Sequence, residues 1–146
     1  MTQATENFSE RLATLQTRIR DALNGFDEIQ KKAEPEIHSI IAEHIALHTR
    51  HENALSARLR ELGHQPEEDG SFFSVVQRLI IKTRAAFTDI DSDVLGAVAD
   101  GEERISQLYA DATAQAMSDE DRAMLQDQRA QLESLIARTR IKAEAA

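Results

Sequence analysis

The sequence predicts an all-α protein built as an up-down bundle of helices. The composition is typical of helices, with only 5 Gly, 2 Pro and 4% aromatic residues in a chain of 146. Ala, Leu, Glu, Gln and Arg, which favour helix, are abundant. Apolar residues recur at steps of three and four, as on one face of an amphipathic helix, and the alternation typical of strands is missing. The length predicts one domain, residues 1–146.

The first two helices are separated by a proline. Residues 6–33 form the first predicted helix, and residues 1–5 before it are expected to fray. Pro35 disfavours helix at the preceding residue and suits the first turn of a new helix. The second helix is therefore expected over residues 36–62, ended by Gly63 in a left-handed conformation. The apolar stripe of the first helix consists of Phe8, Leu12, Leu15, Ile19, Leu23, Phe26 and Ile29.

A third helix is predicted to begin near Ser71, after a loop of residues 64–71 (HQPEEDGS). Its segment VVQRLII is apolar nearly all round, which indicates burial or a contact between copies of the chain. Residues 88–93 (TDIDSD) end this helix and offer capping side chains for the next one.

The last two helices follow in close succession. The fourth is expected over residues 94–117. Ser118 then opens the fifth, with Asp121 at the third position in a variant of the capping box. The tail, residues 142–146, is expected to fray. The fourth helix has the stripe Val94, Val98, Gly101, Ile105, Leu108 and Ala112, and the fifth has Leu125, Leu132, Leu135 and Ile136.

Long helices joined by short loops pack antiparallel to bury their apolar stripes. The predicted fold is therefore an up-down four-helix bundle with an additional C-terminal helix.

Charge and residue content exclude several classes of function. The net charge of −9 disfavours a general nucleic-acid binder, because such a protein needs a basic face to release counterions. The absence of cysteine excludes disulfides and thiolate metal sites. No apolar run is long enough for a membrane span, and no signal peptide is recognisable, so we expect a cytoplasmic protein. No nucleophilic triad or phosphate-binding loop is found, which favours a protein that is not an enzyme, and no specific small molecule is inferred.

The stretch HIALHTRHE, residues 44–52, holds three of the five histidines. At about 100° per residue, His44, His48 and His51 point within roughly 60° of one another. Isoleucine and leucine side chains of the same helix share this direction, so the imidazoles occupy the middle of its apolar face. Glu52 flanks the sector, one turn from His48. Residues three or four apart on a helix are neighbours, so two of these side chains can reach one ion.

One carboxylate on another predicted helix, that of Glu102, is a candidate to contact these histidines. Glu102 lies at the edge of the fourth helix's stripe, with Tyr109, the single tyrosine of the chain, two turns further on. A salt bridge is the commoner role for such a glutamate, and a core position is the commoner role for such a tyrosine. Imidazole and carboxylate ligands suit a transition-metal ion such as Fe, Zn or Cu. The candidate ligands are His44, His48, His51, Glu52 and Glu102.

Three interpretations of the clustered histidines stay open. They can bind a transition metal or another cofactor. They can form a wet, polar core that responds to pH near neutrality. They can also lie at an interface where symmetry-related copies supply the partners that buried imidazoles need.

Four stretches of the chain stand out together, in order and on the predicted helices and loops. They are EPEI (34–37), RELGHQPEEDGS (60–71), the segment 77–88 ending in RAAFT, and GEE (101–103) followed by Tyr109. These stretches resemble a family of small bacterial ferritin-like four-helix-bundle proteins of unknown function. The resemblance covers residues 26–136 and implies the bundle fold. The wider superfamily includes di-iron proteins, which place Glu on two helices and Glu-x-x-His on two others. This chain departs from that pattern, because His48 stands in the glutamate position before His51 and Ile105 stands three residues after Glu102.

The expected function is a non-enzymatic, homo-oligomeric bundle with a His-rich polar core. This expectation rests on the incomplete ligand set within one chain and on the apolar third helix. Metal binding by the histidines of the second helix is the alternative, and a pH-sensing bundle is the second alternative.

Overall fold

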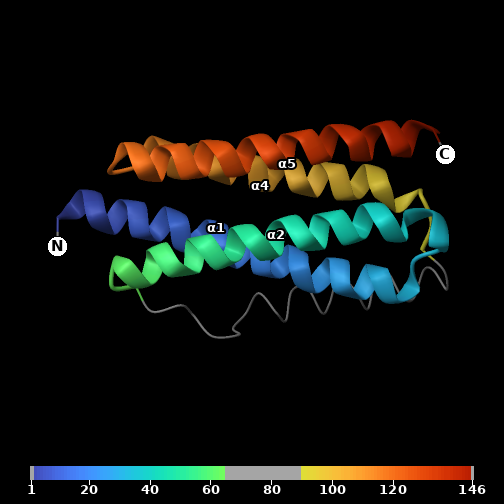
Figure 1. Cartoon of the computed structure of the whole chain (residues 1–146), viewed down its shortest axis with the longest axis horizontal. Helices are drawn as coiled ribbons and strands as arrows, with labels where there is room; N and C mark the ends of the chain where they lie inside the picture. Colours follow the sequence, from blue (N-terminus) through green and yellow to red (C-terminus); the bar gives the residue numbers. More distant parts are fainter. Residues whose placement is uncertain (1, 65–89, 146) are drawn as a thin grey trace.

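The computed structural model describes residues 2–64 and 90–145, and four helices form an antiparallel bundle within them (Figure 1). One hairpin consists of α1 (Gln3–Lys32) and α2 (Pro35–Glu61), and the other of α4 (Val94–Ala114) and α5 (Asp119–Ala145). The hairpins lie side by side, so that α1 packs against α4 and α2 against α5. The predicted all-α bundle is confirmed, and the expected C-terminal helix is α5, one of the four helices of this bundle.

The helix predicted to begin near Ser71 lies outside the described residues. The contact between copies that its apolar surface suggested lies outside them too. Among the described helices, none is long and apolar enough to cross a membrane.

The ends of α1 and α2 follow local sequence signals. α1 begins before the expected residue 6 because Thr2 caps it, accepting a hydrogen bond of 3.2 Å from the backbone N–H of Thr5. Pro35 occupies the first turn of α2, as predicted. Gly63 has φ of +80°, and the N–H of His64 donates to the carbonyl of Leu59 at 2.9 Å. This is the helix-ending motif that favours glycine.

The backbone also ties the two hairpins together at one end of the bundle. The N–H of Ile90 donates to the carbonyl of Lys32 at 3.0 Å, and the N–H of Glu34 donates to the carbonyl of Ile90 at 2.8 Å. These bonds join the corner between α1 and α2 to the segment that leads into α4, and they fix where α4 begins beside that corner.

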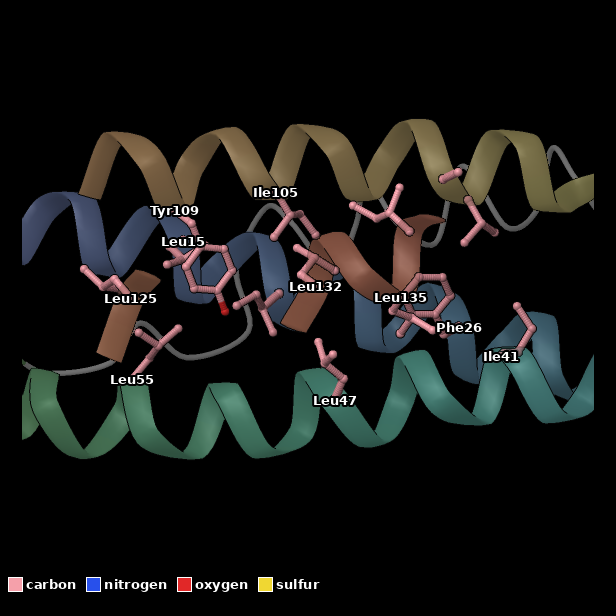
Figure 2. Close-up of a cluster of buried hydrophobic side chains, with 14 of the residues drawn as sticks. Leu15, Phe26, Ile41, Leu47, Leu55, Ile105, Tyr109, Leu125, Leu132 and Leu135 are labelled. Carbon is pink, nitrogen blue, oxygen red and sulfur yellow. The ribbon is translucent and has the colours of Figure 1, made fainter. Parts of the chain in front are cut away.

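The core runs along the axis of the bundle and is built from the predicted stripes of α1, α2 and α5 (Figure 2). The stripe of α4 needs a correction. Leu95, Glu102 and Tyr109, seven residues apart, are all buried, whereas Val94, Gly101 and Leu108 are half-buried. The helix is therefore rotated by about one residue from the expected phase, because the glutamate and the tyrosine face the interior and find polar partners there. Figure 2 shows Tyr109 with its hydroxyl pointing inward.

Candidate metal centre

Three predicted ligands converge in the middle of the bundle. Nδ1 of His44 and Nε2 of His48 each lie 2.7 Å from the same oxygen of Glu102, Oε2. The histidines come from successive turns of α2 and the glutamate from α4, so the cluster joins the two hairpins. Both imidazoles are fully buried and Glu102 is 1% exposed. The three ligand atoms lie within 4.8 Å of one another, close enough to bind one ion together.

The outer nitrogen of His44 is held by α5. Nε2 lies 2.8 Å from the hydroxyl oxygen of Thr139, and that hydroxyl donates to the carbonyl of Leu135 at 2.8 Å. The threonine oxygen is thus available to accept from Nε2–H. His44 donates from both nitrogens only as an imidazolium, and with a metal at Nδ1 the neutral ring keeps the bond to Thr139. A histidine that binds a metal through one nitrogen usually donates the other N–H to such an acceptor, which fixes the ring. Thr139 therefore orients His44 with Nδ1 toward Glu102.

His48 is held more loosely. Its Nδ1 is buried and has no hydrogen-bond partner in the described part of the chain. The ring stacks on Phe26 of α1, with centroids 6.0 Å apart and planes 9° from parallel. Because Nδ1 is unpartnered whichever nitrogen carries the proton, binding of a metal at Nε2 costs no hydrogen bond at Nδ1.

The surroundings of Glu102 favour its carboxylate form. Burial alone raises the pKa of this side chain, since a charge is poorly solvated in the core. The hydrogen bonds from His44 and His48, with the attraction between the groups, outweigh burial and bring the pKa below its ordinary value. An ionised carboxylate beside two imidazole nitrogens is chemically ready to bind a cation.

The structure gives His51 other partners. Its Nε2 donates to the amide oxygen of Gln131 at 3.2 Å, and its Nδ1 lies 3.3 Å from the hydroxyl of Tyr109. That hydroxyl donates to the amide oxygen of Gln128 at 2.9 Å. His51 therefore belongs to a separate polar network, two turns along α2 from His44.

Glu52 faces α1 and not the histidine cluster. Its Oε1 accepts hydrogen bonds from Arg20 at 2.9 Å, from Gln16 at 3.1 Å and from Ser56 at 2.9 Å. Its charge is balanced by the arginine. Of the five candidate ligands, the structure brings together His44, His48 and Glu102, and it separates His51 and Glu52 from them.

Reasoning from the sequence missed Thr139. Its signal was present, because Leu125, Leu132 and Thr139 follow one another at intervals of seven on α5 and all are buried. A polar residue in a core row at this interval indicates a buried hydrogen bond to a neighbouring helix.

The donor set fits a transition-metal ion. Two imidazoles and one carboxylate suit Zn, Fe or Cu, and three protein ligands leave at least one coordination position for water or another molecule.

A search of curated proteins and a search of solved structures found no match. One family, described as Domain of unknown function (DUF2383), matches residues 7–115, which include all three converging ligands but end before α5. The broader kinship with ferritin-like proteins stays a prediction. The chain belongs to the DUF2383 family of uncharacterised proteins.

Proposed function

We propose that this protein binds one divalent transition-metal ion in its core, through His44 Nδ1, His48 Nε2 and a carboxylate oxygen of Glu102. The observation that carries the proposal is the meeting of both nitrogens at one buried oxygen, each at 2.7 Å. Without a metal, protons bridge these atoms. A metal ion replaces those protons and is held by the same three side chains.

The cost of burying this cluster supports a role beyond stability. A buried ion pair is often no more stabilising than apolar residues of similar volume, because each charge loses its hydration. Leu95, in the same row of α4 as Glu102, and Ile41, in the same row of α2 as His48, show that apolar side chains fit this core. The burial of Glu102 beside two histidines is therefore explained by the binding of an ion and not by a gain in stability.

Isothermal titration calorimetry with Zn²⁺ and Co²⁺ tests the proposal, together with elemental analysis of protein purified without an affinity tag. We expect one ion per chain, and we expect His48→Ala to lower the affinity at least about 100-fold, since it removes one of three ligands. The matched control is His51→Gln on the same helix. We expect it to retain the ion, because His51 contacts Gln131 and Tyr109 instead.

Three results would contradict the proposal. The first is a protein that takes up neither ion and carries none when purified, in which case the cluster is a structural hydrogen-bond network. The second is equal binding by the wild type and His48→Ala. If His51→Gln lost the ion as completely as His48→Ala, the proposed set of three ligands would be wrong.

A further inference from the structure

A cavity that is open to solvent lies between α1 and α4, with Glu102 in its lining. Its volume is about 280 Å³. The lining extends from Ala97, which is exposed, to Glu102, which is buried, and includes Phe26, Gly25 and Gly101. The rest of the wall is aliphatic. An enclosed apolar cavity of about 150 Å³ binds benzene. This cavity is larger and opens to solvent, so a single ring with a short side chain can enter it from the surface.

The carboxylate of Glu102 gives this apolar cavity one charged group. Both hydrogen bonds to Glu102 end on Oε2, from His44 and His48. No residue of ranges 2–64 and 90–145 donates to the second oxygen, Oε1. The Glu102 side chain is 2% exposed, so only a small part of it is open to solvent. Within these ranges the oxygen thus lacks a hydrogen-bond donor, and a bound molecule can supply one.

Two glycines keep the wall of the cavity open. Gly25 on α1 and Gly101 on α4 both lie inside helices, where glycine is a poor helix former. Neither has a positive φ, and a Cβ added at either position would meet no atom within 4 Å. Close packing and backbone geometry therefore do not require glycine at these positions. Because Gly25 and Gly101 have no side chains, the cavity wall is open at these two positions.

We propose that this cavity binds a compact, largely apolar molecule whose single amino group donates a hydrogen bond to Oε1 of Glu102. The apolar wall accepts the body of the molecule, and the carboxylate favours a cationic head over a neutral one. The proposal does not depend on a metal ion at His44 and His48.

Benzylamine and ethylbenzene form a matched pair of probes, because they share size and shape and differ in the amino group. Binding is measured by two-dimensional amide NMR on the full chain with a chelator present. We expect benzylamine to shift amides around Gly25 and Gly101, and to bind at least about tenfold more tightly than ethylbenzene, as a hydrogen bond to a charged group implies. Ethylbenzene binding as tightly as benzylamine would overturn the assignment of the amino group to Glu102.

Gly101→Leu fills the cavity and should weaken benzylamine binding at least about tenfold. The matched control is Gly96→Leu, because Gly96 lies on the same helix, also has open space at its Cβ, and does not line the cavity. Equal binding by Gly101→Leu and the wild type would overturn the proposal, as would a loss of binding in Gly96→Leu as large as in Gly101→Leu.

The two sites are separated by a second pair of measurements. Gly101→Leu should retain the metal ion, because Gly101 supplies none of its three ligands. If the wild type binds metal but not benzylamine, the cavity proposal fails alone. If it binds benzylamine but not metal, the metal proposal fails alone.

Discussion

His51 is a histidine whose surroundings disfavour its charged form. Burial lowers its pKa below the ordinary 6.5, because the imidazolium would lose hydration in the core. The hydrogen bond to Gln131 partly opposes this effect. The other groups that act on His51 are the nearby His48 and Arg50, which lower its pKa, Asp127 of α5, which raises it, and the Tyr109 hydroxyl of α4, which contacts the ring.

This environment predicts a pH dependence of folding stability. Because the pKa of His51 is lower in the folded state, the unfolded chain binds more protons as pH falls through about 6.5 toward the folded pKa. The stabilisation from neutral His51 is complete above about pH 7 and decreases in that window. Urea denaturation at a series of pH values should therefore show a smaller loss of stability in His51→Gln than in the wild type. Equal pH profiles would show that His51 does not contribute.

At the scale of single residues, the sequence identified the histidines but not all of their partners. The spacing of His44, His48 and His51 placed all three in the core, and the structure confirms that they are buried. Where each side chain then points depends on neighbouring helices. Glu52 was a candidate metal ligand together with His48 of the same helix. In the structure its carboxylate pairs instead with the guanidinium of Arg20 on α1. Such a pairing cannot be read from the periodicity of α2 alone, because it requires the rotation of α1.

At the scale of helices, α2 and α5 are joined by a row of polar contacts. Three positions on α2, seven residues apart, each bond to a polar side chain of α5. Seven residues are two turns, so these positions lie on one line along α2. Because each contact has a specific partner, the row fixes how far one helix slides along the other. The pairs are His44 with Thr139, His51 with Gln131, and Arg58 with Asp121.

The pair of Arg58 and Asp121 should contribute most to this row. The guanidinium donates to both carboxylate oxygens, at 2.7 Å and 2.9 Å, and the Asp121 side chain is only 6% exposed. Arg58→Met leaves this carboxylate buried without its cation, and we expect a loss of about 1–3 kcal/mol in the free energy of unfolding. Urea denaturation measures the loss.

A double-mutant cycle supplies the control. If Asp121→Asn is added to Arg58→Met, the double variant should lose clearly less stability than the two single variants summed, because removal of the arginine costs less once residue 121 carries no buried charge. Additive losses would mean that the two side chains do not stabilise the protein through each other.

Helix ends were easier to predict than helix rotation. Pro35 and Gly63 act locally through backbone geometry, so their effects appear in the sequence itself. Ser118 accepts from the N–H of Asp121 at 3.1 Å, as the capping signal predicted, but the carboxylate of Asp121 turns to Arg58. The phase of α4 was only partly correct, because it was judged from apolar residues alone: Val98, Ile105 and Ala112 are buried as predicted, but Val94, Gly101 and Leu108 are only half-buried. Glu102 and Tyr109 belong to the core row of Leu95, and only their partners on α2 and α5 make this burial favourable.

At the scale of the whole molecule, the metal site would link the two hairpins. His44 and His48 belong to the first hairpin and Glu102 to the second, so an ion bound only in the folded state stabilises their association. At a free Zn²⁺ concentration of 100 times Kd, we expect a gain of about 2.7 kcal/mol in the free energy of unfolding. Thermal and urea unfolding with Zn²⁺ or with a chelator measures it. His48→Ala should show no gain, and an equal gain in that variant would place the ion elsewhere.

The fold class could be predicted because composition and period both favour helices over the whole chain. The order of the helices around the axis could not be predicted, since the apolar face of any amphipathic helix can pack against that of any other. That order depends on contacts far apart in the sequence, such as those of Glu102 with α2 and Thr139 with His44. The candidate site was therefore predicted in part. His44, His48 and Glu102 were named from their positions on their helices, whereas the contacts that join them across 58 residues, and His44 to Thr139 across 95 residues, depend on that order.

The backbone junction at Ile90 offers a way to observe the association of the hairpins directly. The amide protons of Glu34 and Ile90 are bonded across that junction, not within a helix. Their exchange with deuterated solvent therefore requires the two hairpins to separate at this corner, whereas an amide inside α1 exchanges when that helix itself opens. Two amide signals thus distinguish a bundle whose hairpins come apart as intact units from one whose helices unwind first.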